Sequence, residues 1–484
     1  MNTPVRRVAI ACLVLFLALL VNANYLQVVD AHRLRTDPHN ARELLTTYDR
    51  QRGPIVAGKK EIARSVRTND RLKYLRTYPG GPEYAHVTGY YSFVLGAKDV
   101  ELSENELLAG LDDRLFGSAR LSDLVTGRKR QGGAVVLTID PAAQDAAWRG
   151  LQGKTGAAVA LDPRTGKILA MASTPSYDPG LLTSHDGARI QRNWKRLLAD
   201  PRQPLLDRAI AQTYPPGSLF KVVTSAAALS NGYRPDSVIP APLTYKLPLS
   251  THRLENFGGE SCAARGRTTL TKALEISCNT AFAGLGVKLG AGALAQTARD
   301  FGIGRDDVKV PMPVAPSVFP SDLNAPQTAL AAIGQFDVRL TPLQAAMIAA
   351  AVANHGVLMQ PYLVDHTLAP DLSVLDRPTP QPLAEPVSAE VATELTEMMR
   401  QVVEHGTGTA AQIPGVPVAG KTGTAQHATG QPPHAWFIAF APADAPRVAV
   451  AVLVEDGGGL GSDATGGRVA APIAKSIIEA VLRR

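Results

Sequence analysis

Aromatic side chains are scarce in this sequence, and its basic residues form no long run. Phe, Trp and Tyr make up 5% of the 484 residues. The formal net charge of +7 is spread along the chain, and no block of consecutive basic residues is longer than Arg128-Lys-Arg130. Nucleic-acid binding typically depends on a concentrated basic surface that includes aromatic side chains. We therefore expect no nucleic-acid partner.

Patterns that bind metals or nucleotides are also lacking. The ten histidines are scattered, and the chain has neither a His-Glu-x-x-His sequence nor two cysteines at zinc-binding spacing. The glycine-rich stretch at 457–467 lacks the strand-to-helix context of a phosphate-binding loop. The sequence predicts no metal and no cofactor, and this stretch is expected to be a loop near the rim of a cleft.

Cysteine is rare, with three residues in the whole chain. Cys12 lies in an apolar N-terminal run, which leaves Cys262 and Cys278 as a possible pair. In an oxidising compartment a disulfide between them would close a loop of about 15 residues and stabilise the fold by up to about 3 kcal/mol. Two free and buried thiols are an equally compatible alternative.

Only the N-terminus carries an apolar run long enough to span a membrane. Arg6 and Arg7 precede an apolar run at 8–21, and no charged residue follows before Asp30. About 20 uncharged residues suffice for a helical span, and the arginines favour the cytoplasmic side. Because no small-x-small cleavage site follows cleanly, residues 1–29 are expected to be an uncleaved, single-pass signal anchor. A cleaved signal peptide is the alternative.

Two further regions follow the anchor. Residues 30–135 are charged and rich in turns, and no group of their side chains suggests chemistry. We expect them to form an extended pedestal that holds the next domain away from the membrane. Gly132 and Gly133 mark a boundary, and residues 136–484 are expected to form one globular domain.

This third region alternates between strand and helix patterns. Strands are predicted at 135–139, 157–161, 168–172, 417–425, 434–441 and 447–455. Helices are predicted at 141–151, 270–290, 342–353, 389–404 and 470–482, and a proline-rich loop at 368–386. Strands from both ends of the region, with helices between them, predict an α+β fold in which one antiparallel sheet is covered by helices.

The sequence around Ser218 combines a sharp bend with the start of a helix. Pro215, Pro216 and Gly217 disfavour helix, and a helix-forming run begins at Ser218. Lys221 follows one turn later on the same face. A serine becomes nucleophilic when a neighbouring base takes its proton, and lysine can do this only as a neutral amine. On this segment alone, a helix-capping serine followed by a surface lysine is an equally good interpretation.

Two other segments carry matching chemistry. Ser277-Cys-Asn279 offers a hydroxyl and an amide, and Lys421-Thr-Gly-Thr424 lies on a predicted strand whose Gly423 would let a substrate backbone approach closely. With Ser218 and Lys221 they form the ordered set of three motifs found in penicillin-binding proteins and class A β-lactamases.

Two of the three motifs also occur elsewhere in the chain. Lys154-Thr-Gly156 lies in the turn before the first hairpin, and Ser103-Glu-Asn105 lies in the pedestal. Ser218, in contrast, is the only serine in the sequence with a lysine three residues later. We interpret the extra copies as accidental, and the ordered set on one domain as the functional one.

Beyond these motifs, the sequence resembles class B penicillin-binding proteins over nearly its whole length, most of all the actinobacterial A type. The resemblance rests on Pro215-Pro-Gly-Ser-Leu-Phe-Lys221, Ser277-Cys-Asn279, Ile333-Gly-Gln335 with Leu340-Thr-Pro-Leu-Gln344, Gly406-Thr-Gly408 and Lys421-Thr-Gly-Thr-Ala425. It extends through Arg52-Gly-Pro-Ile55 and Val87-Thr-Gly89 to the N-terminal run. The Arg-Gly-Pro-Ile segment lacks the Asp-Arg that is usual in class B proteins.

The resemblance implies a transpeptidase domain with the fold of serine β-lactamases, on an elongated pedestal with a transmembrane helix. It implies a peptidoglycan D,D-transpeptidase of cell-wall synthesis and division, at the cell membrane with its catalytic domain extracytoplasmic. Stem peptides ending in D-Ala-D-Ala would be substrates, and β-lactams would acylate the enzyme. Residues 30–135 are too few for a glycosyltransferase, so glycan polymerisation would come from a multi-span partner, alongside division proteins.

The resemblance also implies the roles of the catalytic residues. Ser218 would attack the carbonyl of the penultimate D-Ala, and neutral Lys221 would take its proton. Ser277 and Asn279 would relay protons and orient the peptide, with the Ser277 hydroxyl delivering a proton to the departing amine. Lys421 would keep Lys221 uncharged and attract the terminal carboxylate.

Substrate binding is assigned in the same way. The hydroxyls of Thr422 and Thr424 would bind the terminal carboxylate, with Gly423 between them. The backbone N–H groups of Ser218 and Thr424 would form the oxyanion hole, where each donor contributes a few kcal/mol.

Other functions share parts of this pattern. A β-lactamase would need a base that activates water for deacylation, and the sequence identifies none. A D,D-carboxypeptidase shares the chemistry and differs in the acceptor. A non-catalytic β-lactam sensor or division scaffold would need the nucleophile alone, whereas the intact set of motifs favours turnover.

Overall fold

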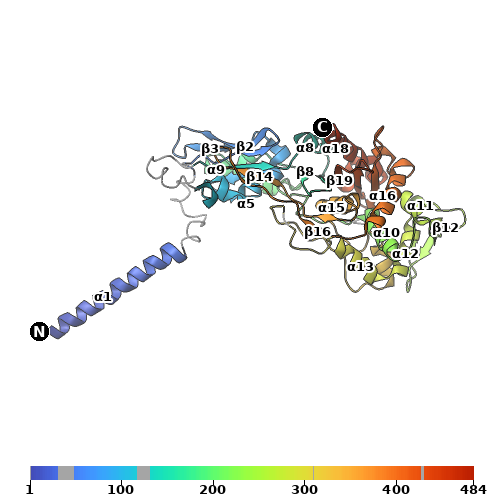
Figure 1. The fold of residues 1–484 in the computed structure, drawn as a ribbon, viewed down its shortest axis with the longest axis horizontal. Helices are drawn as coiled ribbons and strands as arrows, with labels where there is room; N and C mark the ends of the chain where they lie inside the picture. Colours follow the sequence, from blue (N-terminus) through green and yellow to red (C-terminus); the bar gives the residue numbers. More distant parts are fainter. Residues whose placement is uncertain are drawn as a thin grey trace.

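The computed structural model describes residues 2–30, 48, 50–116, 131–308, 310–426 and 430–483. Figure 1 shows three parts: a single N-terminal helix, a smaller body rich in strands, and a larger body of helices around a sheet. The N-terminal helix comes first in the chain, whereas the smaller body combines strands from distant parts of the sequence.

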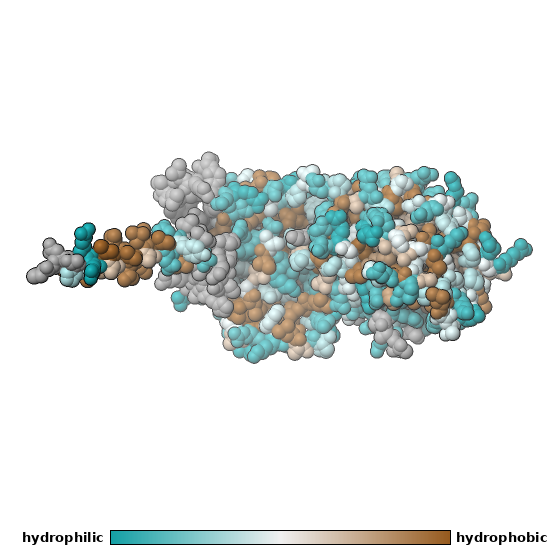
Figure 2. All heavy atoms as spheres, turned by 90° about the horizontal axis from the view of Figure 1, so that it is seen from below, coloured by the Kyte–Doolittle hydropathy of each residue, from teal (hydrophilic) through white to brown (hydrophobic). Residues whose placement is uncertain are grey.

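The N-terminal helix α1 (Asn2–Asn24) continues into one π-helical turn, η1 (Tyr25–Val29). Its stretch Pro4–Gln27 has a mean hydropathy of 2.2, and none of it is buried against the rest of the chain. In Figure 2 this helix carries a continuous apolar surface, whereas the rest of that face mixes polar and apolar residues. Among the described residues it is the one helix long and apolar enough for a membrane span, which fits a single-pass anchor.

The smaller body is built on a six-stranded sheet in the order β15-β14-β6-β1-β2-β3. β1 and β6 run parallel, and the other neighbours are antiparallel. The strands are β1 (Ile55–Ala57), β2 (Lys60–Arg67), β3 (Tyr74–Thr77), β6 (Ala134–Leu137), β14 (Val364–Leu368) and β15 (Val374–Asp376). β14 and β15 therefore come from residues assigned to the globular region, and β6 crosses the expected boundary. The boundary after residue 135 stays a prediction.

A buried ion cluster holds the start of the pedestal in place. Glu101 is fully buried and accepts hydrogen bonds from Arg52 Nε at 2.6 Å, Arg76 Nε at 2.5 Å and Tyr78 OH at 3.0 Å. Burial alone would raise the pKa of Glu101, but the two guanidinium groups lower it below its usual value. The Arg-Gly-Pro-Ile segment therefore has a structural role, because its arginine is one of the two arginine partners of Glu101.

The larger body contains a five-stranded antiparallel sheet in the order β17-β18-β19-β7-β8. Its strands are β7 (Gly156–Leu161), β8 (Ile168–Thr174), β17 (Ala419–Ala425), β18 (His434–Ala441) and β19 (Val448–Val454). Strands from both ends of the region meet in one sheet, so the predicted α+β fold is confirmed. β17 is an edge strand, so its outer side pairs with no further strand of this sheet.

Successive side chains of a strand point to opposite faces of the sheet. Every residue of β18 and β19 is buried, so both faces of this sheet are covered, and helices cover them. One face packs against α8 (Pro141–Gly150) and α18 (Ala471–Leu482). The other packs against a layer that contains α10 (Lys221–Ser230), α15 (Pro342–Ala353) and α16 (Ala389–Glu404). α15 is buried along its whole length and rich in alanine, which lets its neighbours approach closely.

Smaller elements complete the chain. The helices are α4 (Ala85–Thr88), α5 (Val100–Ser103), α6 (Asn105–Leu108), α9 (Gly187–Ala199), α11 (Leu270–Glu275), α12 (Asn279–Leu289), α13 (Ala291–Asp300), α14 (Ala325–Ala331) and α17 (Gly466–Val469). The strands are β4 (Tyr91–Ser92), β5 (Gly96–Ala97), β9 (Val238–Pro240), β10 (Thr244–Lys246), β11 (Arg253–Glu255), β12 (Arg267–Thr269), β13 (Leu358–Met359) and β16 (Pro382–Ala384). β15 and β16 lie within 368–386, where a loop was predicted. β15 pairs with β14 and β16 with β13, and such pairing between segments gives no signal in the local sequence.

Candidate active site

Ser218 lies where the chain turns into helix α10. A 3₁₀ turn, η5 (Gly217–Phe220), carries the serine and leads into the helix. Gly217 has a φ of +54°, a left-handed conformation that glycine adopts without strain. The predicted bend followed by a helix is thus present, with a 3₁₀ first turn. Ser218 is half-buried and lines a cleft of about 1130 Å³.

The turn that carries Ser218 packs backbone to backbone against β17. A Cβ on Gly217 would lie 2.5 Å from Thr424 O, and a Cβ on Gly423 would lie 2.8 Å from Pro216 O. Neither distance is one that real Cβ atoms tolerate. Gly423 was predicted to make room for a substrate backbone, but in the structure it makes room for the protein's own turn. The two glycines thereby set the spacing between Ser218 and β17.

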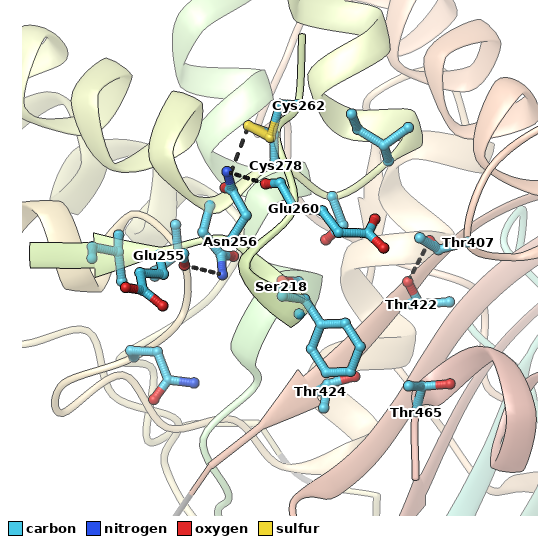
Figure 3. A pocket seen from close by; sticks show the side chains of 18 of the residues that line it. Ser218, Glu255, Asn256, Glu260, Cys262, Cys278, Thr407, Thr422, Thr424 and Thr465 are labelled. Carbon is cyan, nitrogen blue, oxygen red and sulfur yellow. Dashed lines mark hydrogen bonds between the residues drawn. A yellow bond between two sulfur atoms is a disulfide. The ribbon is translucent and has the colours of Figure 1, made fainter. Parts of the chain in front are cut away.

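The second motif lies in a break between two helices, where one helix over 270–290 was predicted. α11 ends at Glu275 and α12 begins at Asn279. Ser277, between them, has a φ of +62°, which is uncommon for serine. The next residue, Cys278, forms a disulfide with Cys262, and Figure 3 shows this bond at the side of the cleft. No glycine or proline marks the break, so the sequence gives no local sign of it.

The break brings the second motif onto two lysine amines. Lys221 Nζ donates to the Ser277 carbonyl at 2.7 Å and to Asn279 Oδ1 at 2.8 Å, and it lies 3.2 Å from Ser277 Oγ. Lys421 Nζ, from β17, lies 2.9 Å from the same Ser277 Oγ and donates to Thr422 O at 2.9 Å. The structure therefore gathers Lys221, Ser277, Asn279 and Lys421, which come from three separate segments.

Both amines are buried completely, and this changes their chemistry. Burial lowers the pKa of Lys221 well below its usual value, and the nearby Lys421 lowers it further. Burial lowers the pKa of Lys421 to about 7. A neutral Lys221 has two N–H groups, which can donate hydrogen bonds to the Ser277 carbonyl and to Asn279 Oδ1. Its lone pair then remains available to take a proton.

The contact between the Ser218 hydroxyl and Lys221 differs from the expectation. The spacing places both groups on one helix face, but within the described residues no hydrogen bond joins them. Lys221 is instead engaged by Ser277 and Asn279. Catalytic hydrogen bonds are often long before a substrate binds. The role of Lys221 as the base for Ser218 stays a prediction.

The cleft next to Ser218 is lined by hydroxyl groups. Thr422 and Thr424 of β17 line it, and Figure 3 shows Thr407 beside Thr422. The Thr407 and Thr422 hydroxyl oxygens are 2.6 Å apart, and Lys421 Nζ lies 3.4 Å from Thr422 Oγ1. An amine and neighbouring hydroxyls are suited to a carboxylate. The sequence assigned no role to Thr407, because its position beside Thr422 depends on tertiary packing.

The extra copies of the motifs lie away from the cleft. Asn105 accepts a hydrogen bond from Arg52 Nη1 at 2.8 Å in the pedestal. The carbonyl of Lys154 accepts one from Thr174 Oγ1 at 2.9 Å at the edge of the β7–β8 hairpin. Neither residue lines the cleft. In the described part of the chain, no three His, Cys, Asp or Glu side chains are grouped so that they could hold a metal ion.

Two family models match this chain. The one described as the penicillin binding protein transpeptidase domain matches residues 156–479, which is more than half of the chain. The one described as the penicillin binding protein A dimerisation domain matches residues 52–135. Together with the fold and the motif cluster, these matches define the class: the chain belongs to the class B penicillin-binding proteins.

Within that class, the chain is similar to proteins of the A type. It is 49% identical over its full length to the peptidoglycan D,D-transpeptidase PbpA of Mycolicibacterium smegmatis, of which it covers 99%. It is 47% identical, with the same coverage, to PbpA of Mycobacterium tuberculosis. The predicted resemblance is thereby confirmed.

Solved structures agree with this assignment. The ceftriaxone acyl-enzyme complex of penicillin-binding protein A from Mycobacterium tuberculosis superposes with a TM-score of 0.88 at 47% identity, over 90% of this chain and 100% of that chain. The D,D-transpeptidase domain of a peptidoglycan glycosyltransferase from Eggerthella lenta gives a TM-score of 0.76 at 34% identity, over 90% of this chain and 98% of that one. The fold is thus that of penicillin-binding transpeptidases.

Proposed function

We propose that this protein is a peptidoglycan D,D-transpeptidase that cross-links stem peptides through an acyl-enzyme on Ser218. The observation that carries the proposal is the cluster of Lys221, Lys421 and Asn279 around Ser277, in the cleft that Ser218 lines. Relatives named as peptidoglycan D,D-transpeptidases at 47% and 49% identity support the same reaction.

The first half-reaction transfers the donor peptide to the enzyme. Ser218 Oγ attacks the carbonyl carbon of the penultimate D-Ala, and its proton passes to neutral Lys221. The peptide C–N bond then breaks, and the Ser277 hydroxyl gives its proton to the departing amine of the terminal D-Ala. Ser277 regains a proton from Lys221, which lies 3.2 Å away. The products are an ester on Ser218 and free D-Ala.

Groups on β17 and on the turn that carries Ser218 would stabilise the negative charge of the oxyanion and of the terminal carboxylate. The backbone N–H groups of Ser218 and Thr424 would bind the oxyanion, and the close packing of Gly217 on Thr424 supports their proximity. The terminal carboxylate would lie against the hydroxyls of Thr422 and Thr424, with positive charge from Lys421 behind them.

The second half-reaction releases the peptide to an acceptor. A neutral amine of a neighbouring stem peptide attacks the ester carbonyl, the C–O bond to Ser218 breaks, and the amine proton returns to the serine through Lys221. The new amide is the cross-link. A β-lactam takes the donor's place, because its strained amide presents a carbonyl to Ser218, and no separate amine departs from the site.

A reaction with two synthetic peptides tests this proposal. The full-length protein is incubated with a stem peptide that ends in D-Ala-D-Ala and a second peptide with a free side-chain amine. Free D-Ala and a cross-linked dimer are expected, and neither should form with Ser218→Ala. D-Ala release with hydrolysed peptide alone would identify a carboxypeptidase. Stable acylation by a β-lactam without either product would identify a sensor, and rapid β-lactam hydrolysis would identify a β-lactamase.

The organisation around the membrane belongs to the same proposal. Residues 1–29 anchor the chain with Arg6 and Arg7 in the cytoplasm, the pedestal follows up to residue 135, and the catalytic domain lies on the extracytoplasmic face. The disulfide between Cys262 and Cys278 supports this orientation, since disulfides persist in oxidising compartments. A multi-span glycosyltransferase would supply the glycan strands, and division proteins would be further partners. Protease added outside intact spheroplasts should digest the catalytic domain.

A further inference from the structure

A carboxylate outside the three motifs lies next to the turn that carries Ser218. Glu455 follows directly after β19 and accepts two hydrogen bonds on one oxygen, Oε1. Tyr214 OH donates at 2.7 Å and Arg208 Nε at 2.8 Å. The Arg208 side chain is 4% exposed and that of Glu455 17%, so this pairing is largely protected from water. Neither Glu455 nor Arg208 lines the cleft.

Arg208 is itself fixed, so it holds the carboxylate in place. Its Nη1 and Nη2 donate to the carbonyls of Gln203 and Arg202 at 3.2 and 2.9 Å. Its backbone N–H donates to Ser173 Oγ, at the end of β8, at 2.9 Å. The guanidinium of Arg208 thus donates hydrogen bonds to Glu455 and to two carbonyls of the loop at 202–203 at the same time. A half-buried carboxylate anchored in this way is a rigid acceptor for a third group.

That third group, Tyr214, begins the segment that ends at Ser218. Its backbone N–H and carbonyl bond to Leu340 at 2.8 and 2.9 Å, and its ring packs edge-on against Trp436 at 6.3 Å. Trp436 Nε1 in turn donates to Pro215 O at 3.0 Å. Two prolines with fixed φ then connect Tyr214 to Gly217. A shift of Tyr214 is therefore transmitted to Ser218 instead of being absorbed by a flexible linker.

We propose that Glu455 is a positioning residue for the nucleophile, which acts through Tyr214 and holds Ser218 against β17. The inference rests on the proposed acylation of Ser218. The phenol stays a donor throughout, because burial and the carboxylate raise the pKa of Tyr214 above its usual value. Without the hydrogen bond between Tyr214 and Glu455, the segment 214–218 has no side-chain hydrogen bond to the end of β19 among the described residues. Misplacement of a nucleophile by about 1 Å can lower a rate by about 100-fold.

The test measures acylation separately from folding. Tyr214→Phe removes one hydroxyl, and Glu455→Gln keeps an acceptor for Tyr214 but loses the charge that pairs with Arg208. In the full-length protein, the rate constant of acylation by a fluorescent penicillin is expected to fall between about 10- and 100-fold in each, with little change in the dissociation constant of the initial complex. The variant Tyr214→Phe/Glu455→Gln should be no slower than the slower single variant, because both changes act through the Glu455–Tyr214 hydrogen bond: the first removes its donor, and the second releases its acceptor from Arg208.

Asp365→Asn is the matched control. Asp365 Oδ1 accepts from Lys167 Nζ at 2.5 Å and is 19% exposed, and this pair joins the β7–β8 turn to β14. The variant Asp365→Asn should lower the melting temperature without changing the rate constant of acylation of the folded protein. The proposal is overturned if Tyr214→Phe and Glu455→Gln behave like this control, or if their effects on acylation multiply. A wild-type protein that fails to be acylated would instead refute the proposed function.

Discussion

Lys221 and Lys421 point their side-chain nitrogens at one oxygen, the Ser277 hydroxyl, from 3.2 and 2.9 Å. Two ammonium groups so close together in a buried site would repel each other strongly. Burial and mutual repulsion therefore favour a state in which Lys221 is neutral. An uncharged Lys221 is what the proposed mechanism requires of the base for Ser218.

The titration of Lys421 should be visible in the stability of the protein. Its pKa is about 7 in the folded protein, against about 10.4 in an unfolded chain. Between these values the unfolded chain binds more protons, so the free energy of unfolding should rise with pH, by up to about 1.4 kcal/mol per pH unit. Below pH 7 the charged amine is buried at full cost. Urea unfolding at pH 7.5, 8 and 9 measures the slope (the upper limit stays below the ionisation of tyrosine).

Lys421→Met is the reference for this slope, because it keeps the length of the side chain and removes the titrating group. The difference in unfolding free energy between wild type and variant should grow in favour of the wild type as pH rises. Parallel curves would mean that Lys421 has an ordinary pKa, and the electrostatic basis for a neutral Lys221 would be lost.

Replacing Ser277 should separate its two roles. Ser277→Ala and Ser277→Gly both remove the hydroxyl shared by the amines, and each should slow acylation by about 100-fold or more. Because residue 277 has a φ of +62°, the glycine variant should be more stable than the alanine variant by about 1 kcal/mol. Penicillin acylation and thermal unfolding measure the two effects. Equal stability of the variants would argue against the left-handed conformation.

Gly423→Ala should harm both folding and acylation. The new Cβ would lie 2.8 Å from Pro216 O and 2.9 Å from Trp436 Cβ, so the nucleophile's turn must move away from β17. We expect a loss of about 1–3 kcal/mol in unfolding free energy and at least tenfold slower acylation. Gly292→Ala is the control: no atom lies within 4 Å of its Cβ, and it should be neutral or stabilising by up to about 1 kcal/mol. Unaffected acylation in Gly423→Ala would show that the position of Ser218 does not depend on this glycine.

The disulfide should contribute measurably to stability. Cys262 and Cys278 are separated by 16 residues in sequence, and a bond across a loop of this size restricts the unfolded chain by about 3 kcal/mol. Cys262→Ala/Cys278→Ala should lower the unfolding free energy by that amount, as should a reductant acting on the wild type. Cys12→Ala, in the N-terminal helix, should change neither the unfolding free energy nor its response to the reductant. A double variant as stable as the wild type would count against the bond.

The parts of the fold and site that the sequence predicted are those set by local patterns. The bend before Ser218 follows from two prolines and a glycine, and Lys221 follows from helical spacing. The strand that carries Lys421 and Thr422 was predicted from its own segment, 417–425, and is present as β17. Each of these segments could be located without knowing what it packs against.

The parts that the sequence did not predict depend on tertiary contacts. Ser277 is forced into a left-handed conformation between two helices, and nothing in residues 270–290 signals a break. Thr407 meets Thr422, and Glu455 meets Tyr214, only because distant segments pack together. Gly423 was located correctly, but its neighbour is the protein's own backbone, which no pattern along one strand can reveal.

The identity of the nucleophile is the claim on which the rest depends, and mass spectrometry of the penicillin-treated protein tests it most directly. Wild-type protein should carry one penicilloyl group, and peptide mapping should place it on Ser218. Ser218→Ala should carry none, whereas Ser225→Ala, one of the next serines along α10, should be labelled like the wild type. An adduct on any other residue, or labelling of Ser218→Ala, would contradict the account.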